Sequence, residues 1–95
     1  MPKIEKVDAS SKSFQNRLKS LPDEIRADAI EVIKDLLKDP MPKRIRFHRH
    51  EGYSRPTIFT VHVTRNHSHK LSLELRGTTA ILRSIGTHKQ IDRAP

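Results

Sequence analysis

The sequence predicts a single α+β domain over residues 1–95, in which an N-terminal pair of helices covers one face of a four-stranded antiparallel sheet. Apolar residues recur with a helical period as far as residue 38 and with a period of two from residue 44 onward. The stretch "DPMP" at 39–42 separates the two patterns and stops the second helix. A helical stripe and an apolar sheet face bury each other when they stack, which leaves the second sheet face open.

The first part of the chain predicts a helical hairpin over about 8–38. Its first helix has start signals at Asp8 and at the serines of 10–11. The apolar stripe of this helix is Phe14, Leu18 and Leu21. The second helix has Pro22 in its first turn and Ser20 as its cap. Its stripe is Ile25, Ala29, Val32, Ile33, Leu36 and Leu37. Residues 3–7 leave open a brief strand before the hairpin.

The second part predicts a sheet over about 44–86, followed by a short C-terminal tail over 87–95. The expected strands are 44–50, 57–64, 70–76 and 80–85. In the last strand we place Ala80 and Leu82 toward the helices and Ile81, Arg83 and Ile85 away from them. The open face then carries a cationic set: Arg44, Arg46, His48, His50, His62, Lys70, Ser72 and Arg83. Such a surface suits contacts to a phosphate backbone.

Composition narrows the function classes. The chain has no cysteine, which excludes disulfides and cysteine-based zinc sites. No apolar run reaches the roughly 18–20 residues of a membrane span, and the N-terminus lacks the apolar core of a signal peptide, so we expect no membrane partner and a cytoplasmic location. Residues 1–40 hold eight basic and eight acidic side chains, whereas residues 41–95 hold eleven and three. All six histidines also lie in the second part, which predicts a polyanion-binding half.

Two stretches carry a resemblance to a known family. They are "F…L..LP.EI…A…I..LL.DP" over 14–40 and "VTRNHSHKLSLELRGTTAILRSIGTHKQID" over 63–92. Together they cover nearly the whole chain, and the final strand running into "IGTH" is the more specific part. The sequence resembles the RelE/ParE toxin superfamily of toxin–antitoxin systems, closest to its YafQ-like and HigB-like branches. The resemblance implies an mRNA interferase that cuts ribosome-bound message and is silenced by an antitoxin, which we expect to be acidic and partly disordered.

The resemblance also implies roles for individual residues. His88, in "GTH", corresponds to a catalytic histidine, and Arg83 to an arginine that contacts the scissile phosphate. Lys70 stands where relatives usually have arginine, which keeps the charge and loses the bidentate fork. Ile91 stands where several relatives have an aromatic residue that stacks on a base.

Metal-independent RNA cleavage needs a base for the 2′-hydroxyl, an acid for the leaving oxygen and cations for the phosphorane. Histidine can serve in either proton role. We expect Gly86 to let the chain turn so that His88 points back toward Arg83. The candidates for the second proton-transfer group are His50, His67 and His69. Before the resemblance is counted, spacing alone favours a solvated tail histidine at 88 over a catalytic one. For Arg83, a surface pair with Glu74 across the sheet is then as well supported as a phosphate contact.

The remaining cations are candidates for binding a nucleic-acid backbone. They are Arg44, Arg46, Arg49, Arg55 and Arg65, and Tyr53 could stack on a base. His-x-His spacing at 48–50 and 67–69 would suit a metal, but no complete ligand set is evident, and we expect neither a metal nor another cofactor.

Two other functions stay open from the sequence. One is a ParE-like toxin that inhibits DNA gyrase without cutting RNA, a reading favoured by Lys70 and Ile91. The other is an unrelated nucleic-acid-binding domain that uses the open sheet face. Alanine at 83 or 88 separates these from the enzyme, because only the enzyme depends on one or two residues.

Overall fold

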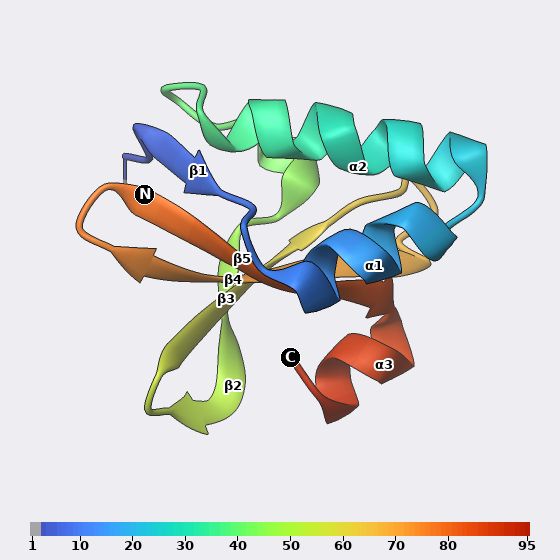
Figure 1. Cartoon of the computed structure of the whole chain (residues 1–95). Coiled ribbons are helices and arrows are strands. Elements are labelled where there is room, and N and C mark those ends of the chain that lie inside the picture. The colour runs from blue at the N-terminus through green and yellow to red at the C-terminus, as the bar shows by residue number, and fades with distance from the viewer. Residues whose placement is uncertain (1–2) are drawn as a thin grey trace.

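The chain forms a five-stranded mixed sheet with helices on both faces (Figure 1). The computed structural model describes residues 3–95, apart from the side chains of Tyr53 and Ser54. In chain order the elements are β1 (Lys6–Asp8), α1 (Lys12–Ser20), α2 (Asp23–Leu36), the 3-10 turn η1 (Lys43–Ile45), β2 (His48–Ser54), β3 (Thr57–His62), β4 (His69–Arg76), β5 (Thr79–Thr87) and α3 (His88–Arg93). The strands lie side by side in the order β1-β5-β4-β3-β2.

The two predicted helices are present and cover one face of the sheet. Ser11 is the cap of α1, because its hydroxyl accepts from the backbone N–H of Phe14. The prediction of Ser20 as the cap of α2 is wrong: its hydroxyl donates to the carbonyl of Arg17, and α2 starts after Pro22 without a side-chain cap. The two helices therefore follow the apolar periodicity, but only one uses the expected cap.

The main core lies between these helices and the sheet. Its buried members are Ile4, Phe14, Ala29, Val32, Leu36, Met41, Ile45, Val61, Val63, Leu71, Leu73, Ala80, Leu82 and Ile85. The helices supply Phe14, Ala29, Val32 and Leu36, and alternating positions of β3, β4 and β5 supply the facing side chains of the sheet. In the described part of the chain, no helix has the length and apolarity to cross a bilayer.

The prediction of a strand over 44–50 is wrong for residues 44–47, which precede β2. Lys43–Ile45 form the turn η1, and Arg46 follows with a φ of 49°, in the left-handed region. This turn buries Ile45 in the main core, which an extended strand at the sheet edge would not do. Arg44 and Arg46 are consequently not on the open sheet face, and β2 instead continues to Ser54.

A bulge at Arg83 changes the faces of the last strand. Ser72 pairs with Ser84 while Leu73 pairs with Leu82, so β5 has one extra residue at this point. Because side chains alternate with period two, one extra residue shifts the alternation. Ile85 therefore lies in the main core with Leu82, and our prediction that it faces outward is wrong.

The sheet is also larger than the predicted four antiparallel strands. β1 pairs in parallel with β5, with Val7 opposite Ala80. The brief strand left open over 3–7 thus exists, shifted to Lys6–Asp8. It pairs with the edge of β5 that would otherwise be open. Because this one pairing is parallel and the others are antiparallel, the sheet is mixed.

The C-terminal stretch predicted as a tail folds as α3, on the face opposite α1 and α2 (Figure 1). Thr87 and Gln90 form a reciprocal capping box, and Ile91 is fully buried beneath the helix. Gly86 has no left-handed backbone and continues β5, so it does not provide the expected turn. Its missing side chain leaves room for Gln90, whose Oε1 would lie 2.5 Å from a Cβ at this position.

Candidate active site

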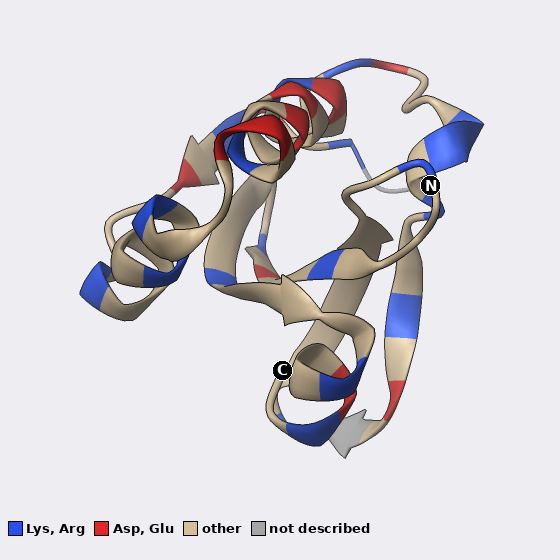
Figure 2. Cartoon of the chain, turned by 90° about the vertical axis from the view of Figure 1, so that its right-hand side faces the viewer, with Lys and Arg blue, Asp and Glu red and all other residues tan. Residues whose placement is uncertain are grey.

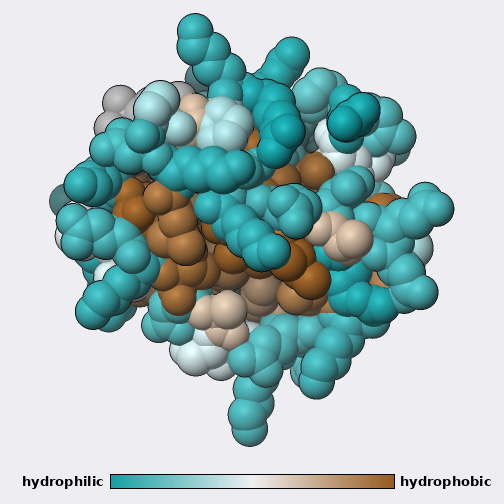
Figure 3. Space-filling view, turned by 90° about the horizontal axis from the view of Figure 1, so that it is seen from above, coloured by the Kyte–Doolittle hydropathy of each residue, from teal (hydrophilic) through white to brown (hydrophobic). Residues whose placement is uncertain are grey.

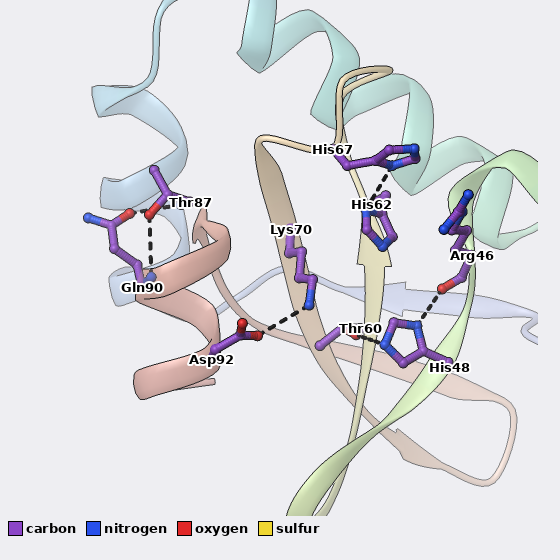
Figure 4. A network of polar contacts seen from close by, with 9 residues as sticks. All are labelled: Arg46, His48, Thr60, His62, His67, Lys70, Thr87, Gln90 and Asp92. Atoms are coloured by element: carbon purple, nitrogen blue, oxygen red, sulfur yellow. Dashed lines mark hydrogen bonds and ion pairs between the residues drawn. The ribbon is translucent and has the colours of Figure 1, made fainter.

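Four histidines meet on the sheet face that carries α3. We call His48, His62, His67 and His88 the histidine cluster. The ring of His62 is central: its centroid lies 4.5 Å from that of His67, 5.2 Å from His88 and 6.2 Å from His48. These residues come from β2, β3, the β3–β4 loop and the start of α3, so the cluster exists only in the folded chain. Figure 4 shows three of its members, His48, His62 and His67.

His62 and His67 share a hydrogen bond between their Nδ1 atoms, 2.9 Å apart. One ring must donate and the other accept, so a single proton lies between the two imidazoles. His67 lies in the β3–β4 loop and itself has a φ of 59°, a left-handed conformation that is uncommon outside glycine.

His48 is fixed through both ring nitrogens. Its Nδ1 donates to the carbonyl of Arg46 at 2.7 Å, and its Nε2 lies 3.1 Å from the hydroxyl of Thr60, which is fully buried (Figure 4). A ring held on both sides orients its neighbours rather than moving freely. His48 therefore fits a positioning role toward His62.

His88 begins α3, and its backbone N–H donates to the carbonyl of Ser68, which ties the helix to the β3–β4 loop. Its Nε2 is buried and has no hydrogen-bond partner in the described part of the chain. An unpartnered buried nitrogen is costly and needs an explanation, and a proton-transfer role supplies one.

The environment of His62 lowers its pKa from the ordinary 6.5 to about 4. Burial is the largest cause, followed by positive charge on His67 and His88, then on Lys70 and His48. His62 is therefore neutral at pH 7 and can accept a proton. The negative charge of a phosphate bound beside His62 would favour the protonated ring and so raise its pKa again.

Lys70 lies next to His62 in the sheet and opposite Gly86. Its side chain is 9% exposed, and its ammonium lies 3.2 Å from Asp92 of α3 (Figure 4). The half-exposed carboxylate offsets this charge and anchors α3 to the sheet. Lys70 is thus in place beside the histidines, with its ammonium directed toward Asp92.

Arg83 is not brought to the histidine cluster. Its guanidinium lies 3.0 Å from Glu74, and its Nε donates to the carbonyl of Pro95. In the register it lies in the bulge beyond the Ser72–Ser84 pair, three residues along β5 from Gly86, which is opposite Lys70. The cross-sheet pair with Glu74 weighed from the sequence is present. Ile91 faces the sheet, so its side chain offers no surface for stacking on a base.

The other predicted residues are scattered. His69 starts β4 with its Nδ1 2.7 Å from the Ser68 hydroxyl, and His50 is half-buried two residues beyond His48. Arg44 donates to Asp35 at 2.7 Å and so carries a partly neutralised charge. The other predicted arginines, Arg46, Arg49, Arg55 and Arg65, are exposed, as Arg44 is. The side chain of Tyr53 lies outside the described residues.

His62 is the central residue that our sequence prediction did not assign to the site. It was placed on the open face, but nothing singled it out from the other polar positions there. Its one signal is its position in the strand before the "RNHSH" loop, where it alternates with Val61 and Val63 and so faces away from the main core. No group of three or more His, Asp or Glu side chains among residues 3–95 is arranged to hold a metal ion.

Comparison with known proteins supports the fold. No protein-family model matches the chain, and neither does any curated protein. Among solved structures, the chain is similar to RelE in a RelB–RelE antitoxin–toxin complex from Methanococcus jannaschii, with a TM-score of 0.67 and 22% identity over 95% of this chain and 99% of that one. A RelE–RelB complex from Pyrococcus horikoshii gives a TM-score of 0.61 and 16% identity over 92% and 96%.

A conserved hypothetical protein from Helicobacter pylori gives a TM-score of 0.59 and 21% identity, over 94% of this chain and 97% of that one. These likenesses show that the chain has the fold of RelE toxins. The first two are RelE proteins by name, so the comparison supports that broad superfamily fold and not the YafQ-like or HigB-like placement.

Proposed function

We propose that this protein is the toxin of a toxin–antitoxin system and cleaves RNA by metal-independent acid/base chemistry at the histidine cluster. The observation that carries the proposal is the meeting of four imidazoles and Lys70 on one sheet face. The RelE-like fold supports the toxin assignment. Ribosome-bound mRNA as the substrate, the cytoplasm as the location and the YafQ-like or HigB-like branch rest on the sequence resemblance.

In this mechanism the neutral His62 takes the 2′-hydroxyl proton, and its hydrogen bond to His67 passes charge between the rings. His88 protonates the leaving 5′-oxygen through its unpartnered nitrogen. Lys70 stabilises the negative charge that develops on the phosphorane, once the substrate competes with Asp92 for its ammonium.

The partner in this proposal is an antitoxin. Ile30 and Leu37 are the large hydrophobic side chains that stand exposed among the described residues, at 44% and 45%. They lie seven positions apart on α2, which is the spacing of one helix face. Seen from above, hydrophobic residues are visible between hydrophilic ones on this face (Figure 3). An amphipathic segment of an antitoxin would cover this stripe.

The test is to induce the protein in a bacterial host without an antitoxin and to map mRNA 5′ ends by primer extension. Wild type should produce new ends at fixed codon positions in translated messages. His88→Ala and His62→Ala should abolish them, while Lys89→Ala, an exposed neighbour on α3, should not. Cuts that persist in both histidine variants would refute the assignment.

A second candidate is a non-catalytic, ParE-like toxin acting on gyrase. The observation that favours it is the engagement of both expected phosphate cations, Lys70 by Asp92 and Arg83 by Glu74. Growth arrest with intact mRNA in the same experiment, and loss of supercoiling activity by gyrase, would select this candidate.

A further inference from the structure

A groove of about 610 Å³ runs beside the histidine cluster, between α2, the turn η1 and the β3–β4 loop. His62 and His67 line the groove and also belong to the cluster, so the two form one continuous surface. The volume falls within the range of small-molecule binding sites. A strand of RNA with its scissile phosphate at the histidines would therefore place an adjoining nucleoside in this groove.

The two walls of the groove have opposite charge. Asp28 and Glu31, both exposed, line it from α2, the helix on which acidic residues are concentrated in Figure 2. Arg46 and Arg65, also exposed, line the other side. The buried Asp35 does not add to the acidic wall, because it is paired with both Arg44 and Lys38.

Three apolar side chains lie at the base of the groove. Val32 from α2, Ile45 from η1 and Val63 after β3 all line the groove and are buried in the core behind it. A flat aromatic ring can lie against such a surface, with one polar edge toward each wall. A nucleotide has this pattern, with a phosphate at one end and a base edge at the other.

The acidic wall restricts which base fits. Carboxylates lower the affinity for any polyanion, so they contribute selectivity rather than strength. They accept hydrogen bonds from the exocyclic amino groups of adenine, cytosine and guanine. Uracil presents two carbonyl oxygens flanking a single N–H, and these oxygens repel a carboxylate.

We propose that the groove binds a nucleoside of the RNA substrate whose base bears an exocyclic amino group, and that Asp28 and Glu31 exclude uracil. Arg46 and Arg65 bind the adjoining phosphates. This inference rests on the proposed function, because it takes the ligand to be RNA.

The test is binding of 2′-O-methyl trinucleotides, which cannot be cleaved through the blocked 2′-oxygen. The full-length protein is titrated with the trimers of cytidine and of uridine while backbone amide shifts are followed by NMR. Cytosine and uracil have the same size, and cytosine has an amino group where uracil has a carbonyl oxygen. Stacking therefore does not explain a difference in affinity between the two trimers. We expect shifts at residues 62–67 and a dissociation constant about tenfold lower for the cytidine trimer.

A double variant, Asp28→Asn with Glu31→Gln, should bring the two dissociation constants within about threefold, because an amide can pair with either base. The matched control is Glu24→Gln, an exposed carboxylate on the same helix outside the groove, and it should keep the tenfold difference. Arg46→Gln with Arg65→Gln should weaken both trimers alike.

Equal affinity for the two trimers, a difference that survives the double variant, or shifts confined to residues outside the groove would each overturn the inference. Failure of the proposed function is seen separately. A protein that discriminates between the trimers but makes no cuts in cellular RNA keeps the groove assignment and loses the enzymatic one. A protein that cuts RNA without discriminating loses only the groove assignment.

Discussion

Acidification should destabilise the fold through His62. The ring is held neutral, with its pKa lowered to about 4 by burial and by its cationic neighbours, whereas the unfolded chain has the ordinary value of 6.5. The stability from this site is complete above pH 6.5 and is lost as the pH falls toward 4, because the unfolded state takes up the proton first. At pH 5 the full difference corresponds to about 2 kcal/mol. Because the ring is partly exposed, we expect about 1 kcal/mol after solvent screening.

The assay is urea unfolding followed by far-ultraviolet circular dichroism at pH 7 and pH 5. Wild type should lose about 1 kcal/mol more of its unfolding free energy than His62→Gln over this interval. His69→Gln, a histidine outside the cluster, should retain the wild-type loss. If His62→Gln and wild type lose the same amount, the cluster does not hold His62 neutral and the reasoning is wrong.

Three further predictions follow from particular contacts. Gly86→Ala should lower the unfolding free energy by about 1 kcal/mol, because the new Cβ displaces Gln90 from the α3 capping box; Gln90→Ala should cost the same, measured by urea unfolding. Asp35→Asn should cost about 1–2 kcal/mol above pH 4 and less below, because the pKa of this carboxyl is lowered and its contribution is lost on protonation. Ile30→Asp with Leu37→Asp should weaken antitoxin binding at least tenfold by calorimetry, with thermal unfolding unchanged.

Each of these has a result that would contradict it. The Gly86 and Gln90 variants act on one contact, so costs that add fully in the double variant would exclude the shared capping box. An Asp35→Asn protein with the acid sensitivity of wild type would show that the ion pairs with Arg44 and Lys38 add no stability. Unchanged antitoxin affinity in the doubly charged α2 variant would place the partner elsewhere.

The helices and most of the sheet could be predicted because their signals are local. Phe14, Leu36 and Leu73 occupy the core positions that simple periodicity assigns them. The helix α3 was not predicted, although Thr87 and Gln90 have the spacing of a capping box. Its six residues are too few to show a helical period in the apolar pattern.

The bulge at Arg83 and the histidine cluster have no comparable signal in the chain. A bulge is decided by which register buries more apolar surface, and here both Leu82 and Ile85 reach the core only if one residue is skipped. The position of His67 over His62 depends on one left-handed loop residue. Pairing between distant segments, rather than any local pattern, sets both features.

The place of β5 in the sheet has a consequence for when the protein can act during its synthesis. This strand is made after the other four strands of the sheet, yet it lies between β1 and β4 and supplies Ala80, Leu82 and Ile85 to the core. A nascent chain that still lacks it has no strand to join β1 to β4, and its main core lacks these three side chains. His88 follows directly, so the core and the histidine cluster are completed together. A chain built in this order cannot complete its core or its histidine cluster until β5 has emerged.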